Sequence, residues 1–497
     1  MSRQVQIEAP HTLARLQVLL GEPVQWNRRG IRHGLVVLTE SPDNLADFPG
    51  KSLLLSVMKR SGMKPEKLRS AALAAPLDGV LLSWIWVNPA DARFRVQSAL
   101  CQALKGLVVE RPDHLALSLH GAGAREVAAQ VLYVAWLNGV ALPDRRKNPS
   151  SGVGVLHLHG APLNDVRFRV AGEVAKANTL ARHLTLLPPN ELTPGTYRQY
   201  LKDLSRRQPW RYHEYTTSRL RQMGAGAFMA VAQGSPKEDA AIVHLQYRGP
   251  KARRRVALVG KGICFDTGGH NLKPARYMYG MHEDMNGSAV ALGILSAVSA
   301  LELPVVLDVW LALAQNHISP LAYKQNDVVT ALDGTTIEIV HTDAEGRMVL
   351  ADTLTLASRQ RPDLILDFAT LTGSMHTALG SRQSGIFASD ERLEGLARGV
   401  GQVTGERVVP FPLAEDYDAA LESRVADVKQ CTPDGDADHI LAARFLRRFT
   451  GQCSWVHMDL SASRNEGGLG AVGSDVTGFG VHWGVGFVDS WLKNGLQ

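Results

Sequence analysis

Short apolar runs alternate with amphipathic stretches over the first 165 residues of the chain. Continuous or alternating apolar residues predict strands, and apolar residues spaced three to four apart predict helices. The region has no glycine-rich phosphate loop, no suggestively spaced acids and no Cys/His cluster, so it shows no chemistry of its own. We predict an N-terminal α/β domain over residues 1–165, with strands at 34–39, 79–87, 114–119 and 153–159 and helices at 92–107 and 124–138.

A long amphipathic stretch follows this region. Residues 166–187 have the apolar spacing of a helix, and the prolines Pro188, Pro189 and Pro194 then bar its continuation. We therefore expect a connecting helix over 166–187 and a domain boundary at its end. The rest of the chain, 188–497, is the predicted catalytic domain.

Nearly continuous apolar runs mark the strands of this larger α/β domain. Such runs are expected of central strands in a mainly parallel or mixed sheet with both faces covered. Ligands of such sheets collect beyond the carboxyl ends of the strands. The predicted strands are 256–259, 305–314, 336–341 and 364–369, with intervening helices at 287–301 and 348–359.

Charged residues cluster after these predicted strands. Lys261 and Asp266 follow the first strand, Asp343 and Glu345 follow the third, and residues 370–373 follow the fourth. They are therefore expected to meet at one edge of the sheet.

Bulk composition narrows the class of protein. The chain has 497 residues, 45% of them hydrophobic, which is enough for a large core in a soluble globular protein. It has no apolar run long enough for a membrane span, and the N-terminus lacks the apolar segment of a signal peptide, so we expect a cytoplasmic location. The four cysteines are widely spaced, which indicates neither a disulfide framework nor a thiolate metal site.

The net charge of +6 leaves nucleic-acid binding open as a second reading. The basic runs 251–255 and 145–147 could contact nucleic acid, although basic runs at loops are usually only solvated.

Four acids in one crevice need compensating charge. At an effective dielectric of about 20, two like charges about 4 Å apart repel by roughly 4 kcal/mol. Asp266, Asp284, Asp343 and Glu345 would therefore not stay ionised together without cations. Two divalent metal ions would cancel the four charges and form a centre able to bridge a hydroxide and polarise a carbonyl. The alternative is a set of separate surface salt bridges.

Two lysines accompany the acids. Lys261 could be a counter-ion or, if a nearby dication lowers its pKa, a nitrogen ligand. Lys273 could belong to the site or be an ordinary surface lysine.

The ordered motifs resemble the leucyl aminopeptidase family, the cytosolic two-metal type. They are Gly-Lys-Gly-Ile-x-Phe-Asp-x-Gly-Gly, Leu-Lys-Pro, Asp-Met, Thr-Asp-Ala-Glu-Gly-Arg and Ala-Thr-Leu-Thr-Gly. The resemblance is strong over residues 256–373, looser from 188 to about 480, and limited to a general α/β pattern over 1–165.

This resemblance implies roles for the site residues. Lys261, Asp266, Asp284 and Glu345 would bind the tighter metal, and Asp266, Asp343 and Glu345 the more exchangeable one. Lys273 would hold the substrate carbonyl oxygen and the developing gem-diolate. Arg347 would anchor bicarbonate, which can move a proton because every carboxylate is engaged with metal.

The resemblance also implies substrate contacts and an assembly. The pocket for the first side chain would contain Met281, Thr370, Gly373 and Val476, with apolar walls that favour Leu- or Met-like residues, although Met281 could equally be core packing. Similar enzymes are hexamers with active sites facing an internal cavity.

Several positions depart from the family pattern. His341 stands where Asn usually precedes the Thr-Asp-Ala-Glu-Gly-Arg motif, and Asn286 stands where a small residue usually follows Asp-Met. His270 and Asn271 replace a more apolar pair, and residues 455–468 are polar where relatives have small residues. His341 could add a ligand or only serve at the strand end. These departures affect side-chain preference and metal choice.

We expect a metal-dependent aminopeptidase that removes N-terminal Leu- or Met-like residues through a metal-bridged hydroxide. Oxygen-rich sites with one amine suit Mn²⁺, Zn²⁺, Mg²⁺ or Co²⁺ alike, so the residues do not determine the metal. We expect Mn²⁺ or Zn²⁺, with Mg²⁺ or Co²⁺ as alternatives. Three alternatives stand beside it: a DNA-binding regulatory protein that keeps the peptidase fold, an inactive relative, and a hydrolase of dipeptides or Cys-Gly.

Overall fold

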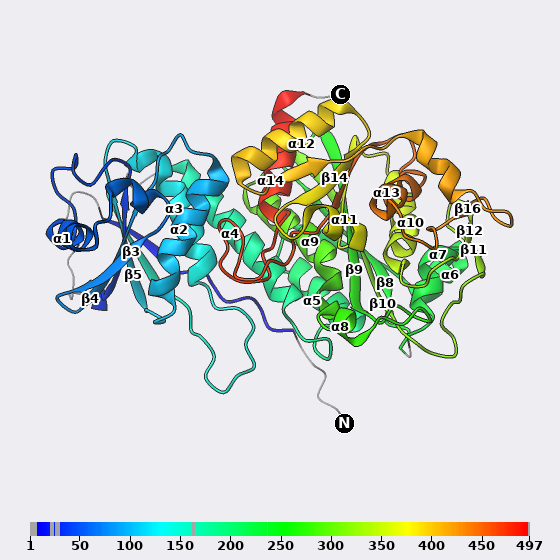
Figure 1. Cartoon of the computed structure of the whole chain (residues 1–497). Helices are drawn as coiled ribbons and strands as arrows, with labels where there is room; N and C mark the ends of the chain where they lie inside the picture. Colours follow the sequence, from blue (N-terminus) through cyan, green and yellow to red (C-terminus); the bar gives the residue numbers. More distant parts are fainter. Residues whose placement is uncertain (1–6, 20–23, 25–29, 162–164, 236, 496–497) are drawn as a thin grey trace.

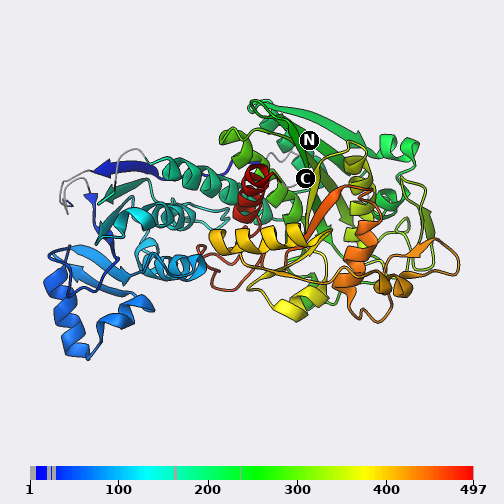
Figure 2. The same ribbon diagram turned by 90° about the horizontal axis from the view of Figure 1, so that it is seen from above.

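The strands of the computed structural model form two large sheets and one small one (Figures 1 and 2). The structure describes the chain except for residues 1–6, 20–23, 25–29, 162–164, 236 and 496–497. One lobe, blue to cyan in Figure 1, holds the first sheet, and the other lobe, green to red, holds the remaining two. This is the mixed α/β architecture that the sequence predicts.

The first sheet has six strands in the order β1-β6-β5-β2-β4-β3. All neighbours are parallel except β3, which is antiparallel to β4. Each predicted strand is present within two residues of its expected ends, whereas β1 and β3 were not predicted. The strands are β1 (Arg15–Leu19), β2 (His33–Leu38), β3 (Leu73–Leu77), β4 (Val80–Trp86), β5 (His114–His120) and β6 (Val155–His159). The helices are α1 (Lys51–Ser61), η2 (Pro65–Arg69), α2 (Arg93–Val108) and α3 (Ala124–Gly139).

Helix α4 (Val166–Thr185) joins the two lobes. It begins where the Asp165 side chain accepts a hydrogen bond from the Arg167 amide. The chain resumes as a helix only at α5, where Thr193 and Thr196 form a capping box and Pro194 takes the first turn. The proline-rich segment therefore ends one helix and starts the next.

The second sheet has eight strands in the order β15-β14-β17-β13-β9-β10-β8-β7. The central strands β17, β13, β9 and β10 are parallel, and antiparallel pairs flank them. The strands are β7 (Trp210–Thr216), β8 (Ala241–Arg248), β9 (Arg254–Asp266), β10 (Val305–Asn316), β13 (Leu364–Ala369), β14 (Ser384–Ala388), β15 (Val408–Pro410) and β17 (Ser454–Asp459).

Helices cover both faces of this sheet. Alternate residues of β9 face opposite cores, with Val256 and Leu258 in one apolar cluster and Ala257 and Val259 in the other. The helices are α5 (Pro194–Ser205), α6 (Thr217–Met223), α7 (Gly226–Ala232), α8 (Ala275–Met278), η3 (Met281–Met285), α9 (Asn286–Ala300), α10 (Glu345–Ser358), α11 (Gly373–Leu379), α12 (Glu391–Thr404), η4 (Glu415–Leu421), α13 (Asp438–Arg447) and α14 (Val481–Asn494).

Two strand predictions were wrong in ways that matter for the site. Strand β9 runs on to Asp266, so Lys261 and Asp266 lie within the strand and not after it. The predicted central strand 336–341 is only β12 (Thr336–Glu338), which pairs with β11 (Val328–Thr330) and β16 (Val428–Lys429) in a separate three-stranded sheet. Asp343 and Glu345 therefore reach the site from a loop and from the start of α10.

Glycines let α9 approach the centre of the large sheet. A Cβ atom on Gly287 would collide with the carbonyl oxygen of Phe368 in β13, and one on Gly260 would lie 2.6 Å from Cα of Ser288. Only glycine allows these backbones to come so close. The contact places the short helix η3, which precedes α9, beside the end of β9.

None of the helices described here has the length and apolar character that a bilayer crossing requires.

Candidate metal centre

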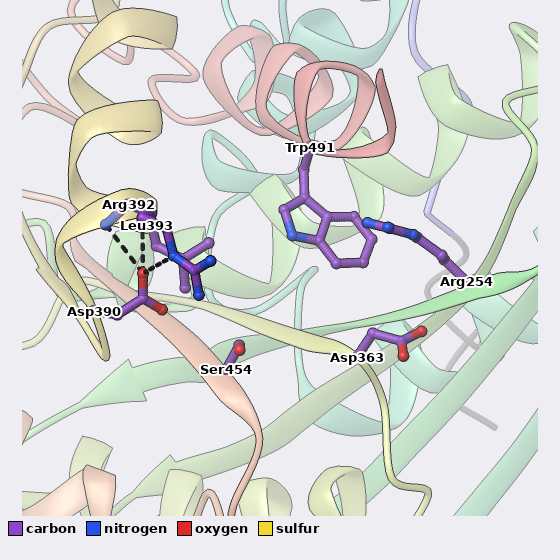
Figure 3. A pocket seen from close by; sticks show the side chains of 7 residues that line it. All are labelled: Arg254, Asp363, Asp390, Arg392, Leu393, Ser454 and Trp491. Carbon is purple, nitrogen blue, oxygen red and sulfur yellow. Dashed lines mark hydrogen bonds and ion pairs between the residues drawn. The ribbon is translucent and has the colours of Figure 1, made fainter. Parts of the chain in front are cut away.

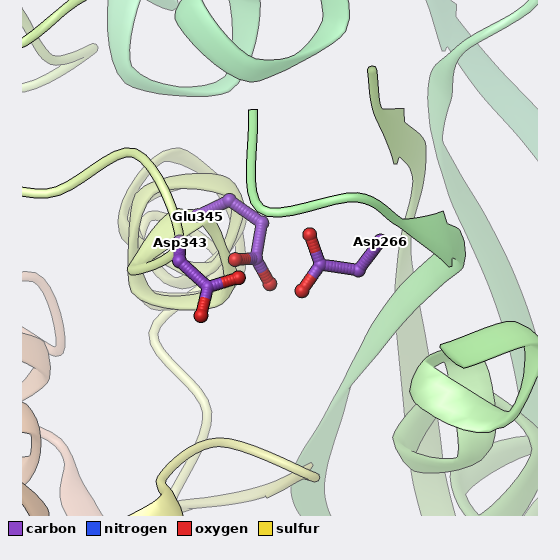
Figure 4. Close-up of side chains that lie close together, drawn as sticks. All are labelled: Asp266, Asp343 and Glu345. Carbon is purple, nitrogen blue, oxygen red and sulfur yellow. The ribbon is translucent and has the colours of Figure 1, made fainter. Parts of the chain in front are cut away.

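Three carboxylates point toward one another at the carboxyl end of β9 (Figure 4). Asp266 ends the strand, Asp343 lies in the loop before α10, and Glu345 is the first residue of that helix. Each side chain contributes one carboxylate oxygen to a group of three that lie within 4.8 Å of one another. Spacing of this kind suits a shared cation, and within the described residues no second group of three potential ligands meets the same criterion.

A fourth carboxylate joins the group through Lys261. The lysine Nζ atom lies 2.9 Å from Asp284 Oδ1 and 2.8 Å from Glu345 Oε1, and it donates a hydrogen bond of 2.8 Å to the carbonyl oxygen of Thr370. Burial lowers the pKa of this ammonium, but the charges of the two carboxylates outweigh burial and raise its pKa. In this structure Lys261 is thus a buried counter-ion.

Lys273 bridges the other side of the cluster. Its Nζ atom lies 2.9 Å from Asp266 Oδ2 and 2.5 Å from Asp343 Oδ1. Burial lowers the lysine pKa, while Asp266, Glu345 and Asp343 raise it above the ordinary value. Its side chain is only 15% exposed, so the reading of Lys273 as an ordinary surface lysine is wrong.

The acids lack enough positive charge to stay ionised together. Burial and the neighbouring charges of Glu345 and Asp266 raise the pKa of Asp284 to about 8. Burial and the same neighbours raise the pKa of Asp343 to about 7, and burial and Asp266 also raise the pKa of Glu345. The cluster thus has the electrostatic character of a site that accepts cations.

Two carboxylate oxygens are also left without hydrogen bonds. Asp284 Oδ2 and Glu345 Oε2 are buried and have no partner among the described residues. Buried polar atoms nearly always have a hydrogen-bond partner, so these two oxygens call for a further, positively charged partner. Hard oxygen donors that converge in this way fit divalent metal ions.

Polar residues that the sequence did not single out hold the cluster in place. Asn316, at the end of β10, donates hydrogen bonds of 2.8 Å to Asp266 Oδ1 and 3.0 Å to the carbonyl oxygen of Thr342. Asp459, at the end of β17, accepts from the Leu371 amide and the Thr372 hydroxyl and so fixes the loop after β13. Each is the last residue of its strand, and no sequence motif marks either position.

Arg347 lies under the cluster in the first turn of α10. Its Nη1 atom donates to the carbonyl oxygen of Gln430 at 2.9 Å, and its Nη2 atom donates to Asp438 Oδ2 at 2.8 Å. The Nε atom is buried and has no partner in the described part of the chain. The Nε–H donor of this guanidinium therefore has no hydrogen-bond acceptor among the described residues.

The four residues expected to contact the substrate side chain have different surroundings. The Thr370 hydroxyl donates to Asp284 Oδ1 at 2.7 Å, which places it at the cluster. Gly373 begins α11 with no atom within 4 Å of the position that a Cβ atom would take, and Met281 begins η3 and is half-buried. Val476 is 1% exposed and forms an isolated antiparallel β-bridge with Arg464 in the loop after β17.

The departures from the family pattern have structural partners. His341 Nδ1 accepts a hydrogen bond of 3.2 Å from the Asp343 amide, and Asn286 Nδ2 donates one of 3.0 Å to the Thr185 hydroxyl at the end of α4. Asn271 Oδ1 accepts from the Thr342 amide at 2.9 Å. These polar residues fix the loops beside the cluster and the helix behind it.

A second hollow lies at the opposite ends of the same strands (Figure 3). Arg254 begins β9 and lies 4.8 Å from the centroid of the Trp491 ring, while Asp390 caps helix α12.

Acidic residues pair with both basic runs of the sequence, 251–255 and 145–147. In the first run, Arg255 lies 3.4 Å from the buried Asp308. Arg145 of the other run pairs with Glu191. Part of each basic run thus has a structural role.

Comparison with known proteins identifies the class. The family model described as "Cytosol aminopeptidase family, catalytic domain" matches residues 179–483, more than half of the chain. A probable cytosol aminopeptidase from Parasynechococcus marenigrum is 34% identical over 490 residues, which cover 94% of this chain and 97% of that protein. The chain belongs to the cytosol aminopeptidase family.

Other relatives match over a shorter region. A probable cytosol aminopeptidase from Legionella pneumophila is 39% identical over 310 residues, which cover 62% of this chain and 64% of that protein. Such matches span less than two thirds of the relatives' own length.

Solved structures share the whole architecture. The bottromycin maturation enzyme BotP, solved in complex with Mn, has a TM-score of 0.81 and 30% identity, and the match covers 93% of this chain and 99% of BotP. A mutant of tomato leucine aminopeptidase has a TM-score of 0.80 at 23% identity over 98% of each chain, which shows the common fold.

Proposed function

We propose that this protein is a metal-dependent aminopeptidase that hydrolyses the first residue from peptides. The observation that carries the proposal is the group of four carboxylates and two lysines in which two buried oxygens lack partners. Family membership and the relative solved with Mn support the same reading.

The residues that would hold two divalent metals are Lys261, Asp266, Asp284, Asp343 and Glu345. Bound metals would supply Lewis acidity toward the substrate carbonyl and would ease deprotonation of a water molecule. We propose Mn²⁺ or Zn²⁺ as these metals, with Mg²⁺ or Co²⁺ as alternatives that the same donors accept. Lys261 would first have to lose its proton to become a ligand.

Lys273 has the chemistry for the oxyanion. Its ammonium lies beside Asp266 and Asp343, so it can donate a hydrogen bond to the carbonyl oxygen of a substrate bound there. The bond would strengthen as negative charge develops on that oxygen, which lowers the barrier.

Arg347 offers a place for a proton carrier. The carboxylates of the cluster would be engaged by metal, so another group must move the proton from water to the leaving amine. The free Nε donor of Arg347 can hold bicarbonate in that role.

Substrate choice depends on the surface beside the metals. Met281, Thr370, Gly373 and Val476 would form the pocket for the first side chain, with a preference for Leu- or Met-like residues. We further propose a division into an N-terminal domain (1–165), a connecting helix (166–187) and a catalytic domain (188–497), a homohexameric assembly and a cytoplasmic location.

Removal of metal tests the proposal directly. Dialysis against EDTA should abolish the release of leucine from leucine p-nitroanilide, and added Mn²⁺ or Zn²⁺ should restore it, with bound metal counted by mass spectrometry. A panel of aminoacyl amides then measures side-chain preference. Activity that persists in metal-free protein would contradict the scheme.

A further inference from the structure

A cavity of about 580 Å³ lies away from the carboxylate cluster, between the N-terminal segment and helix α4. Apolar and aromatic side chains from α3, α4 and α5 line it, and its volume falls in the range of about 300–1,000 Å³ that small-molecule sites occupy. The principal apolar walls are Trp136, Phe168, Leu180, Tyr200 and Leu204.

The wall opposite α4 is fixed by hydrogen bonds. Trp136 Nε1 donates to the carbonyl oxygen of Ala14 at 2.9 Å, and His183 Nε2 lies 3.0 Å from the carbonyl oxygen of Glu8. Residues 10–14, which line the cavity, therefore run between two anchored points. Hydrogen-bonded segments of both lobes therefore form the walls of the cavity.

One polar group inside this cavity lacks a partner. Thr179 lines the cavity, is 2% exposed, and its hydroxyl makes no hydrogen bond with any residue that the structure describes. A threonine in a helix commonly bonds a carbonyl of the preceding turn, and an unpaired buried hydroxyl is unfavourable. A polar group on a ligand would satisfy it.

Two basic residues and one acid stand at the rim. Lys176 Nζ lies 2.8 Å from Glu173, and Arg169 lies 3.9 Å from Glu302, which does not line the cavity. The lining residues themselves therefore carry one more positive than negative charge. Lys176 and Thr179 are three residues apart in α4 and therefore face the same side of the helix. A cation and an unpaired hydroxyl stand next to each other at one side of an apolar hollow.

We propose that this cavity binds a small amphipathic carboxylate. The apolar body would lie against Trp136 and Leu180, and the carboxylate would accept hydrogen bonds from Thr179 and Lys176. The proposal concerns a site separate from the metal centre and does not rest on the peptidase function.

Octanoate is a suitable probe, and octan-1-ol is the matched uncharged compound. Isothermal titration calorimetry on the full-length protein should show a single saturable site for octanoate. Octanoate should bind at least about 5-fold more tightly than octan-1-ol, because both can hydrogen-bond to the Thr179 hydroxyl but only the carboxylate carries a charge that attracts Lys176.

Gly172 offers a variant that fills the cavity. It lies in α4, and a Cβ atom there would be 3.6 Å from the Trp136 ring, at ordinary contact distance. Gly172→Leu should therefore project into the hollow and weaken octanoate binding at least about 10-fold, while the helix gains a better helix former. Gly106→Leu is the control, because Gly106 lies in α2 with nothing within 4 Å of its Cβ position.

A second variant tests the polar contact. Thr179→Val keeps the shape but removes the hydroxyl, so octanoate binding should fall several-fold, and octan-1-ol binding should fall less because its hydrogen bond to Thr179 is uncharged and weaker. Both variants should retain leucine p-nitroanilide hydrolysis, which separates this proposal from the proposed function.

Three results would overturn the proposal. They are no binding of octanoate to the wild type, equal binding to Gly172→Leu and the wild type, and a change in sedimentation of Gly172→Leu. The last result would mean that the cavity is an interface between copies of the chain.

Discussion

Lys273 lies between Asp266 and Asp343, where two opposite charges hold its ammonium in place. A group fixed in this way loses little freedom when substrate arrives, which is the condition for stabilising a charge that appears only in the transition state. The same contacts join Lys273 to the acids and not to a metal. Removal of its side chain should therefore lower turnover much more than it lowers metal content.

Lys273→Ala should lower kcat at least about 100-fold, because loss of one oxyanion donor has an effect of that order. Metal content, measured by mass spectrometry, should change by less than half. Lys324→Ala is the matched control, since Lys324 is 66% exposed and pairs only with the nearby Asp327. A fully active Lys273→Ala protein would remove this residue from the mechanism.

The residues of the cluster could be predicted because they sit in short ordered motifs, as Asp343 and Glu345 do. The residues that hold the cluster in place could not be predicted. Asn316 and Asp459 lie far apart in the chain and belong to no motif, and Gln430 and Asp438 contact Arg347 only through the fold. Nothing local in the sequence tells which distant carboxylate or loop such a side chain meets.

At the scale of elements, β9 shows why strand ends are hard to place. Gly260 and Gly262 interrupt its apolar run and suggest that the strand has ended. In the structure they lie inside the strand, because a backbone without side chains lets α9 pack closely against it.

The prediction of 336–341 as a central strand failed for a different reason. Its apolar residues, including Ile337 and Ile339, are buried beside the large sheet and not within it.

Gly287→Ala should destabilise the protein by about 3 kcal/mol or more, because the new methyl group would collide with the Phe368 carbonyl and force α9 away from β13. Denaturant unfolding followed by circular dichroism measures the change. Gly106→Ala, in the exposed face of α2, should instead raise stability slightly, since alanine is the better helix former and nothing lies within 4 Å. Equal stability of the two variants would show that the close approach carries no energetic weight.

At the scale of the whole molecule, the two lobes are tied by buried polar contacts far apart in sequence. Asn138 at the end of α3 donates to the carbonyl oxygen of Ala471 at 2.8 Å and accepts from the Gly473 amide at 2.7 Å. Gln97 of α2 donates to the carbonyl oxygen of Thr404 at 3.0 Å. The first lobe therefore contacts both the loop after β17 and the end of α12.

Asn138→Ala should lower the free energy of unfolding by about 2 kcal/mol, because it leaves backbone groups of the Ala471–Gly473 turn without partners. Calorimetry should also show one heat-absorption peak for the wild type, since lobes joined in this way unfold together. Gln199→Ala serves for comparison, because it removes only an exposed bond to Asp203. Two separate peaks in the wild type would show that the lobes are independent.

The hydrogen bond between Asn286 and Thr185 couples the connecting helix to the carboxylate cluster. It fastens the end of the connecting helix to the start of the helix that follows Asp284, so the connector is braced and not a hinge. Rotation of one lobe would therefore move Asp284 and disturb the carboxylate cluster. Under the proposed function, we expect a peptide to enter through movements of the bordering loops while the two lobes keep their relative orientation.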